Sequence, residues 1–222
     1  MISAYLFDLD GTLIETESLW TTAVHQWIRE QGKEIDYATV NAWVLGRSWP
    51  SICETIFDRW PDLTTDPRDL AIITRRLYFK VRASADIRIP SSIALLRTLS
   101  ATTPCAIVSG STRDDIAEAI DIMEVADCLR FYLGCEDYPR GKPDPAGFLM
   151  AAQRLRVPPE QCVVFEDSAP GILAARRARM KVVALARPGA VPQDTSHADL
   201  VLPDLAPFTP AMLENGRSAS TP

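Results

Sequence analysis

The chain has 222 residues, of which 47% are hydrophobic and 23% are charged, and its formal net charge at pH 7 is −6. This length suits one sizeable domain, or one domain with a smaller insertion, and the composition is that of a globular protein with a buried core. The acidic balance argues against a broad basic surface for nucleic acid or for an anionic membrane, so we expect neither partner.

No stretch approaches the roughly 18 unbroken apolar residues of a membrane span. Residues 1–10 lack a basic region followed by an apolar run, so we expect no signal peptide. Five cysteines without a CxxC pair are typical of free thiols in a reducing compartment, which favours a cytoplasmic protein. The two histidines are too few for a multi-histidine metal site.

The first part of the chain predicts one strand followed by helices. Residues 4–7 form a short apolar run that ends in an Asp-Gly sequence, as a fully buried strand does. Apolar residues at helical spacing predict helices over 19–28 and 52–60, and a third helix is expected from about 68 to about 84. Residues 16–86 are therefore expected to be all-helical.

The second part of the chain alternates strands with helices. We expect a helix after the first of these strands, capped by Ser111, and a helix with Pro170 in its first turn after the second. The alternation predicts a parallel, doubly wound α/β sheet, with the helical segment inserted after its first strand. The expected strands are 105–110, 162–167, 181–185 and 199–202, and the expected domains are an α/β core of 1–15 and 87–222 and a helical cap of 16–86.

Unusual polar residues follow three of the predicted strands. Because ligands bind outside the carboxyl ends of the strands in open α/β sheets, these residues are expected at one edge, with a loop lysine beside them. They are Asp8 and Asp10 after the first strand, Ser109, Gly110 and Ser111 after the second, Glu166 and Asp167 after the third, and Lys142 in "GKPDP".

This combination of groups fits phosphoryl transfer. Carboxylates suit a hard cation such as Mg²⁺, while a lysine, a hydroxyl and helix-start N–H groups suit a phosphate. Asp8 would attack phosphorus and form an aspartyl-phosphate, and Asp10 would protonate the leaving oxygen and later activate water. Taken singly, each group has a plainer interpretation, as a turn, a helix cap or a solvated lysine. Their occurrence together and in this order favours the functional interpretation.

The sequence resembles the haloacid dehalogenase superfamily, and within it the phosphatases and β-phosphoglucomutase-like enzymes with a helical cap. The resemblance covers nearly the whole chain and the family's four signature segments. They are "DLDGT", Ser109, Lys142 in "GKPDP" and the acidic pair of "FEDSAPGI".

The resemblance implies a role for each matching residue. Asp8 is the nucleophile and a metal ligand, and Asp10 is the acid and base and offers its backbone carbonyl to Mg²⁺. Asp167 is a further ligand, with Glu166 supporting it. Phosphate binding falls to Ser109, Gly110 and Lys142, and supporting or substrate-binding roles fall to Ser111, Thr16 (a hinge residue near the cap) and Arg47.

The expected function is a Mg²⁺-dependent, monomeric phosphatase of a small phosphorylated metabolite, a sugar or polyol phosphate. One alternative is a sugar phosphomutase, but Trp20 occupies a position where such enzymes commonly have histidine. The other alternative is a non-catalytic binder of a phosphorylated ligand. In the cap, "LGRS" (45–48) resembles a loop that faces the site in sugar-phosphate relatives. Arg47 would there touch substrate or lie in solvent, and Trp20 and Trp49 would line a substrate wall or pack the interior.

Overall fold

The computed structural model describes residues 1–44, 47 and 49–215. They fall into two compact units, one made of Met1–Ile14 and Arg88–Pro222 and the other of Glu15–Ile87. We call them the core unit and the helical unit. Their bounds lie one residue from those expected from the sequence.

The described residues of the core unit form a six-stranded parallel sheet in the order β3-β2-β1-β4-β5-β6. This is the doubly wound strand order, so the predicted fold class of a parallel α/β sheet with an inserted helical domain is confirmed. The strands are β1 (Ala4–Phe7), β2 (Cys105–Val108), β3 (Phe131–Leu133), β4 (Cys162–Glu166), β5 (Lys181–Leu185) and β6 (Leu200–Leu202).

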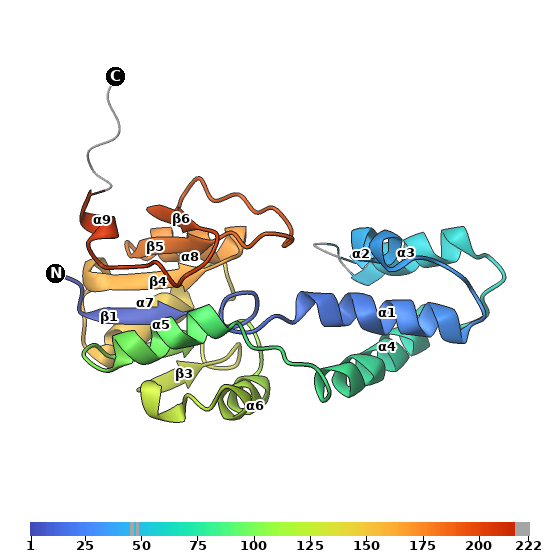
Figure 1. The fold of residues 1–222 in the computed structure, drawn as a ribbon, viewed down its shortest axis with the longest axis horizontal. Coiled ribbons are helices and arrows are strands. Elements are labelled where there is room, and N and C mark those ends of the chain that lie inside the picture. Colours follow the sequence, from blue (N-terminus) through green and yellow to red (C-terminus); the bar gives the residue numbers. More distant parts are fainter. Residues whose placement is uncertain (45–46, 48, 216–222) are drawn as a thin grey trace, which may run out of the picture. The chain divides into compact units, whose positions relative to one another are not determined.

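Helices cover both faces of this sheet. In Figure 1, α5 lies in front of the sheet, whereas α7 and α8 lie behind it. The helices of the core unit are α5 (Pro90–Ser100), α6 (Arg113–Met123), α7 (Ala146–Leu155), α8 (Ala169–Arg177) and α9 (Met212–Asn215), with short 3-10 helices at Ala126–Cys128 and Pro159–Gln161.

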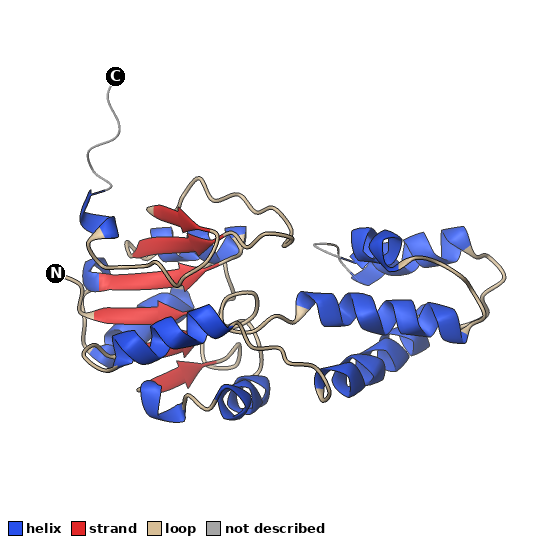
Figure 2. Ribbon diagram, in the orientation of Figure 1, coloured by secondary structure: helices blue, strands red, loops and turns tan. Residues whose placement is uncertain are grey.

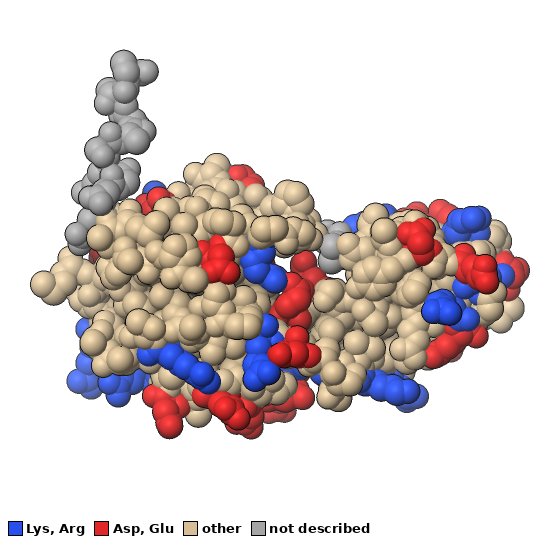
Figure 3. Space-filling view, in the orientation of Figure 1, with Lys and Arg blue, Asp and Glu red and all other residues tan. Residues whose placement is uncertain are grey.

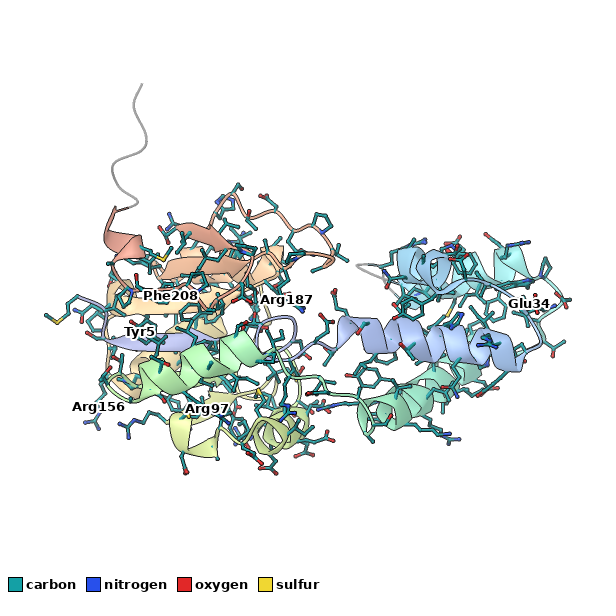
Figure 4. All side chains as sticks on the ribbon, in the orientation of Figure 1. Tyr5, Glu34, Arg97, Arg156, Arg187 and Phe208 are labelled. Carbon is teal, nitrogen blue, oxygen red and sulfur yellow. The ribbon has the colours of Figure 1, made fainter. Side chains whose placement is uncertain are left out.

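Because helices cover both faces of the sheet, β1 is apolar throughout and β4 is apolar up to Glu166. Side chains of a strand alternate between its faces, so a strand buried on both faces is continuously hydrophobic. On one face Leu6 packs in a cluster with residues of α7 and α8. On the other, Phe165 stacks on Phe7 and meets Tyr5 and Phe208, the last two labelled in Figure 4.

The helical unit contains α1 (Glu17–Glu30), α2 (Tyr37–Val44), α3 (Trp49–Arg59) and α4 (Pro67–Arg82). Its interior is apolar and includes Trp27, Ile56 and Leu70, each at most 1% exposed. Local signals set the helix ends. The Asp66 side chain accepts a hydrogen bond from Arg68 N (2.7 Å) at the start of α4, and α3 stops two residues before Pro61.

The expected cap of α6 is wrong. Thr112, not Ser111, is the N-cap, and its hydroxyl oxygen accepts from Asp115 N at 3.2 Å. The Ser111 hydroxyl instead donates to Asp10, at the site described below. Two predicted strands also extend too far, by two residues for β2, which stops at Val108, and by one residue for β4, which stops at Glu166.

Among the described helices, none has both the length and the apolarity needed to cross a membrane. In Figure 3, acidic and basic side chains are interspersed on the face shown of either unit, without a large field of one sign.

Candidate active site

The carboxyl ends of the parallel strands lie at one edge of the sheet, where the arrowheads of Figure 2 point. Phe7 of β1 pairs in register with Ile107 of β2 and with Phe165 of β4. The residues that follow these three positions are therefore brought to the same edge. They include Asp8, Ser109 and Glu166.

Lys142 joins two of these carboxylates. Its ammonium group donates to Asp8 Oδ1 and to Glu166 Oε1, the latter at 2.5 Å. The three side chains are 13%, 8% and 0% exposed for Lys142, Asp8 and Glu166. The lysine also lies 5.3 Å from the ring centroid of Phe148. A lysine held between two buried carboxylates has a fixed position, unlike the solvated loop lysine of the plainer interpretation.

Protein donors also surround the second oxygen of Glu166. Its Oε2 accepts from Asp167 N (3.0 Å), Ser168 N (2.9 Å) and Ser168 Oγ (2.8 Å). Glycine at 171 makes room for this carboxylate, because a Cβ there would lie 1.7 Å from Glu166 Oε1. The start of α8 is thus built around Glu166, which positions Lys142.

The carboxylates of Asp8, Glu166 and Asp167 can hold a metal ion. Each offers an oxygen within 4.8 Å of the other two, close to the separation of about 3–4 Å between ligands that bind one Mg²⁺ at about 2.1 Å. Asp167 also accepts from the Thr12 hydroxyl (3.3 Å). Gly11 has φ +82° and leaves space for Asp167, because a Cβ at 11 would lie 2.0 Å from its Oδ2.

The charges of this cluster also fit a divalent cation. Burial raises the pKa of Asp8 well above its ordinary value; Lys142 opposes that rise, while Glu166, Asp167 and Asp10 add to it. Burial alone would lower the pKa of Lys142, but Asp8 and Glu166 outweigh it and raise the pKa. One lysine therefore does not balance the buried negative charge, and a hard cation would.

Ser111 and Ser109 connect the end of β2 to this cluster. The Ser111 hydroxyl donates to Asp10 Oδ2 at 2.6 Å, and the Ser111 N–H donates to Ser109 Oγ at 3.0 Å. Ser109 is 1% exposed. Because its oxygen accepts from Ser111, its hydroxyl proton can donate to a further acceptor such as a phosphate. The space around Gly110 is open, with no atom within 4 Å of an added Cβ.

The sequence-based prediction missed Tyr138, Gly171 and the part played by Thr12. The Tyr138 hydroxyl donates to the Ser109 carbonyl at 2.6 Å and so fixes the backbone at the end of β2. No local pattern marks Tyr138, because it reaches the site from a distant loop. Thr12 lies in the quoted "DLDGT" segment and Gly171 in the quoted "FEDSAPGI" segment, but neither was given a role, because their close approach to Asp167 and Glu166 is visible only in three dimensions.

The remaining predicted residues belong to the helical unit and are described within it. Thr16 is the N-cap residue of α1 and 6% exposed, and Glu15 Oε1 accepts from Glu17 N at 2.9 Å. Arg47 is exposed and donates to Ser51 Oγ at 2.5 Å. The other three residues of the predicted "LGRS" loop, at positions 45, 46 and 48, lie outside the described residues.

Buried thiols do not compete as nucleophiles. Burial raises the pKa of Cys105 and of Cys162 to about 12, and it also raises the pKa of Cys53. Thiols of this kind stay protonated at neutral pH and are poor nucleophiles.

Comparison with known proteins places this geometry in a family. The family model of the haloacid dehalogenase-like hydrolases matches residues 2–179. Hexitol phosphatase A of Escherichia coli is 30% identical over 214 residues, which cover 96% of this chain and 95% of that protein.

Two further relatives show how widely the fold is used. The bifunctional riboflavin kinase/FMN phosphatase of Arabidopsis thaliana is 30% identical over 187 residues, but this chain spans only 48% of that protein. The crystal structure of a putative β-phosphoglucomutase from Thermotoga maritima superposes with a TM-score of 0.80, covers 99% of this chain and 100% of its own, and is 19% identical. At that identity the superposition supports the fold alone.

Proposed function

The chain belongs to the haloacid dehalogenase-like hydrolases, and on that premise we propose that it is a Mg²⁺-dependent phosphatase of a small phosphorylated metabolite. The observation that carries the proposal is the buried Asp8 carboxylate, held by Lys142 beside Glu166 and Asp167 at the edge of the sheet. A buried carboxylate next to a lysine and a cluster of acids is suited to attack phosphorus once its charge is offset.

The metal would be held by the carboxylates of Asp8 and Asp167 and by the backbone carbonyl of Asp10. Glu166 would support the site without coordinating the ion directly, since both of its oxygens accept from protein donors. Bound there, Mg²⁺ would neutralise negative charge on the phosphate and on the nucleophile. Lys142, the Ser109 hydroxyl and the Gly110 N–H would bind the phosphate oxygens.

The reaction would proceed in two steps. An Asp8 carboxylate oxygen attacks phosphorus while the ester P–O bond breaks, and the protonated Asp10 gives its proton to the leaving oxygen. Asp10 then removes a proton from water, which attacks the aspartyl-phosphate and releases inorganic phosphate. The Ser111 hydrogen bond to Asp10 would set the direction of that carboxyl group.

We propose a sugar or polyol phosphate as the substrate class. The similarity to hexitol phosphatase A of Escherichia coli supports this class. A sugar phosphomutase remains the second candidate, because the motifs of the sequence also resemble those of the β-phosphoglucomutase-like enzymes. We further propose that the protein is cytoplasmic and monomeric. Light scattering of the purified protein gives its mass in solution and so tests the monomeric state.

The test is phosphate release from a panel of sugar and polyol phosphates, with Mg²⁺ and with chelator. We expect release that the chelator abolishes, and a loss of at least about 1000-fold in Asp8→Asn, which removes the nucleophile. The matched control is Asp62→Asn in an exposed ion pair with Lys33, which should leave turnover unchanged.

Three other outcomes would contradict the proposal. Undiminished turnover by Asp8→Asn would refute the covalent step. Interconversion of hexose phosphate isomers without phosphate release would favour the mutase. Binding of phosphorylated compounds without either reaction would favour a non-catalytic binder.

A further inference from the structure

Ser109, at the carboxyl end of β2, is held by contacts on both sides of its backbone. Its N–H donates to the Leu133 carbonyl at 3.0 Å, which continues the ladder between β2 and β3 by one residue. Its own carbonyl accepts from the Tyr138 hydroxyl at 2.6 Å, in a buried contact. The sheet therefore fixes the peptide before Ser109, whereas Tyr138 holds the peptide that joins Ser109 to Gly110.

The Ser109 carbonyl and the Gly110 N–H belong to that one peptide unit. The bond between the two residues is trans, and in a planar trans peptide the C=O and N–H bonds point in opposite directions. The hydroxyl that holds the carbonyl therefore also sets the direction of the N–H. Among the residues that the structure describes, none accepts a hydrogen bond from the Gly110 N–H, so this donor is available to a ligand oxygen.

Glycine at position 110 makes the direction of this peptide easy to change. Gly110 is exposed, and no described atom lies within 4 Å of a Cβ added to it. Glycine also restricts the backbone torsions less than any other residue. A reversed peptide would present the Ser109 carbonyl oxygen where the N–H now points, and that oxygen would repel a phosphate. A phosphate site that uses this N–H therefore needs a group that keeps the peptide from reversing.

Tyr138 is itself held firmly enough to do this. Its side chain is 7% exposed and packs in the same apolar cluster as Phe148. Its ring lies against the first turn of α7, where a Cβ at Gly147 would come within 3.1 Å of it. The preceding residue, Asp137, accepts from the Arg113 guanidinium at 2.8 Å. Burial raises the pKa of Tyr138, so its hydroxyl stays protonated and remains a donor at neutral pH.

We propose that Tyr138 is a positioning residue for phosphate, because its hydrogen bond to the Ser109 carbonyl keeps the Gly110 N–H directed at the phosphate oxygens. This inference rests on the proposed function, since it concerns the same phosphate site. Tyr138 lies four residues before Lys142 in the chain. One loop would then place two phosphate-binding groups, the lysine directly and the amide through Tyr138.

The first arm of the test measures phosphate binding in Tyr138→Phe, which keeps the ring and removes only the hydroxyl. The full-length protein is titrated with inorganic phosphate in the presence of Mg²⁺ and followed by calorimetry. We expect the phosphate affinity to fall about 5–10-fold, as for the loss of one well-directed hydrogen bond, and KM for a phosphate ester to rise by a similar factor. The Mg²⁺ concentration for half-maximal activity should stay unchanged, because Tyr138 holds none of the carboxylates that would bind the metal.

The matched control is Tyr5→Phe, the same substitution at a second buried tyrosine of the core unit. Tyr5 is 3% exposed and lies in β1 with its ring 6.0 Å from that of Phe165 (Figure 4). This variant should bind phosphate as the unaltered protein does. An equal loss of phosphate affinity in both variants would assign the effect to packing of the core unit and overturn the proposal. A parallel loss of phosphate and Mg²⁺ affinity in Tyr138→Phe would overturn it as well.

The second arm observes the peptide itself by NMR. Ser109 and Gly110 form the only Ser-Gly pair in the sequence. Cell-free synthesis with ¹³C-carbonyl serine and ¹⁵N-glycine therefore gives one signal that correlates this carbonyl with this amide. In Tyr138→Phe we expect the carbonyl resonance to move upfield, because the carbonyl loses a hydrogen bond. Phosphate with Mg²⁺ should shift the amide resonance in the unaltered protein and shift it less in the variant.

The outcomes separate this inference from the function on which it depends. Phosphate affinity and amide shifts that are the same in Tyr138→Phe and in the unaltered protein would overturn the role of Tyr138 and leave the phosphatase intact. An unaltered protein that neither binds nor releases phosphate in the presence of Mg²⁺ would refute the proposed function, and with it any role of Tyr138 in phosphate binding.

Discussion

Replacing Gly171 by alanine tests how tightly α8 is built around Glu166. The added Cβ would lie 1.7 Å from Glu166 Oε1 and 2.0 Å from Cδ. Ordinary contact needs roughly 3.4 Å or more, so the carboxylate or the helix must move by more than 1 Å. Movement of the carboxylate would break its contact with Lys142, which now lies at 2.5 Å.

The magnitude follows from three opposing effects. Alanine in place of glycine inside a helix gains up to about 1 kcal/mol. Overpacking of a buried site costs about 1–3 kcal/mol, and a weakened hydrogen bond to a charged group costs about 1.5–3 kcal/mol. We expect a net loss of about 2–4 kcal/mol in the free energy of unfolding, which lowers Tm by about 5–15 °C in a chain of this size.

The assay is thermal unfolding in the presence of chelator, together with phosphate release in the presence of Mg²⁺. The matched control is Gly147→Ala in α7, where the nearest atoms to an added Cβ are Val108 Cγ1 at 3.0 Å and the Tyr138 ring at 3.1 Å. There the neighbours need to move by only a few tenths of an ångström, and the better helix propensity of alanine offsets that cost, so the control should lose less than about 1 kcal/mol. A Gly171→Ala protein with unchanged Tm and turnover would refute the account of Glu166 as the anchor of Lys142.

Three further substitutions address the neighbours of this anchor. Gly11→Ala forces a side chain onto a residue with φ +82° and places its Cβ 2.0 Å from Asp167 Oδ2, so the Mg²⁺ concentration for half-maximal activity should rise at least about 10-fold. Thr12→Val removes the 3.3 Å hydrogen bond to Asp167 and should raise the same concentration by about 3-fold, as measured by Mg²⁺ titration of phosphate release. Ser111→Ala removes the 2.6 Å hydrogen bond to Asp10 and should lower kcat about 10-fold with little change in KM. An unchanged Mg²⁺ dependence in the first two variants, or an unchanged kcat in the third, would contradict the geometry assigned to these residues.

The strands nearest the site could be predicted from the sequence because they are buried on both faces. Residues 4–7 and 162–165 are unbroken apolar runs, and each ends in acidic residues. Burial of such runs in a parallel sheet brings their ends to one edge, and this topology follows from the alternation of strands and helices. The meeting of Asp8 and Glu166 through Lys142 is a consequence of that topology.

Other elements carry too little local signal. β3 has only the three residues Phe131–Leu133, too few to show a period, and its place is set by pairing with β2. The cap of α6 depends on a competition that sequence does not reveal. Ser111 and Thr112 can both cap a helix. The Ser111 hydroxyl donates to Asp10 instead, so Thr112 caps α6.

The carboxylates at the sheet edge differ in how far the protein itself satisfies them, and this difference divides their roles. Glu166 is fully buried, and its oxygens accept from an ammonium group, two backbone N–H groups and a hydroxyl, so its position is fixed and it suits an anchor. Asp8 shares the same lysine but lies where burial and neighbouring acids disfavour its charge. On the proposed function, a bound cation together with Lys142 would stabilise such a carboxylate as an anion, and its ionisation would then be coupled to metal binding. Asp8 and Asp10 are therefore tolerated close together in the sequence because other residues fix each of them. Lys142, itself held by Glu166, fixes Asp8, and Ser111 fixes Asp10. A bound cation would offset the negative charge that remains.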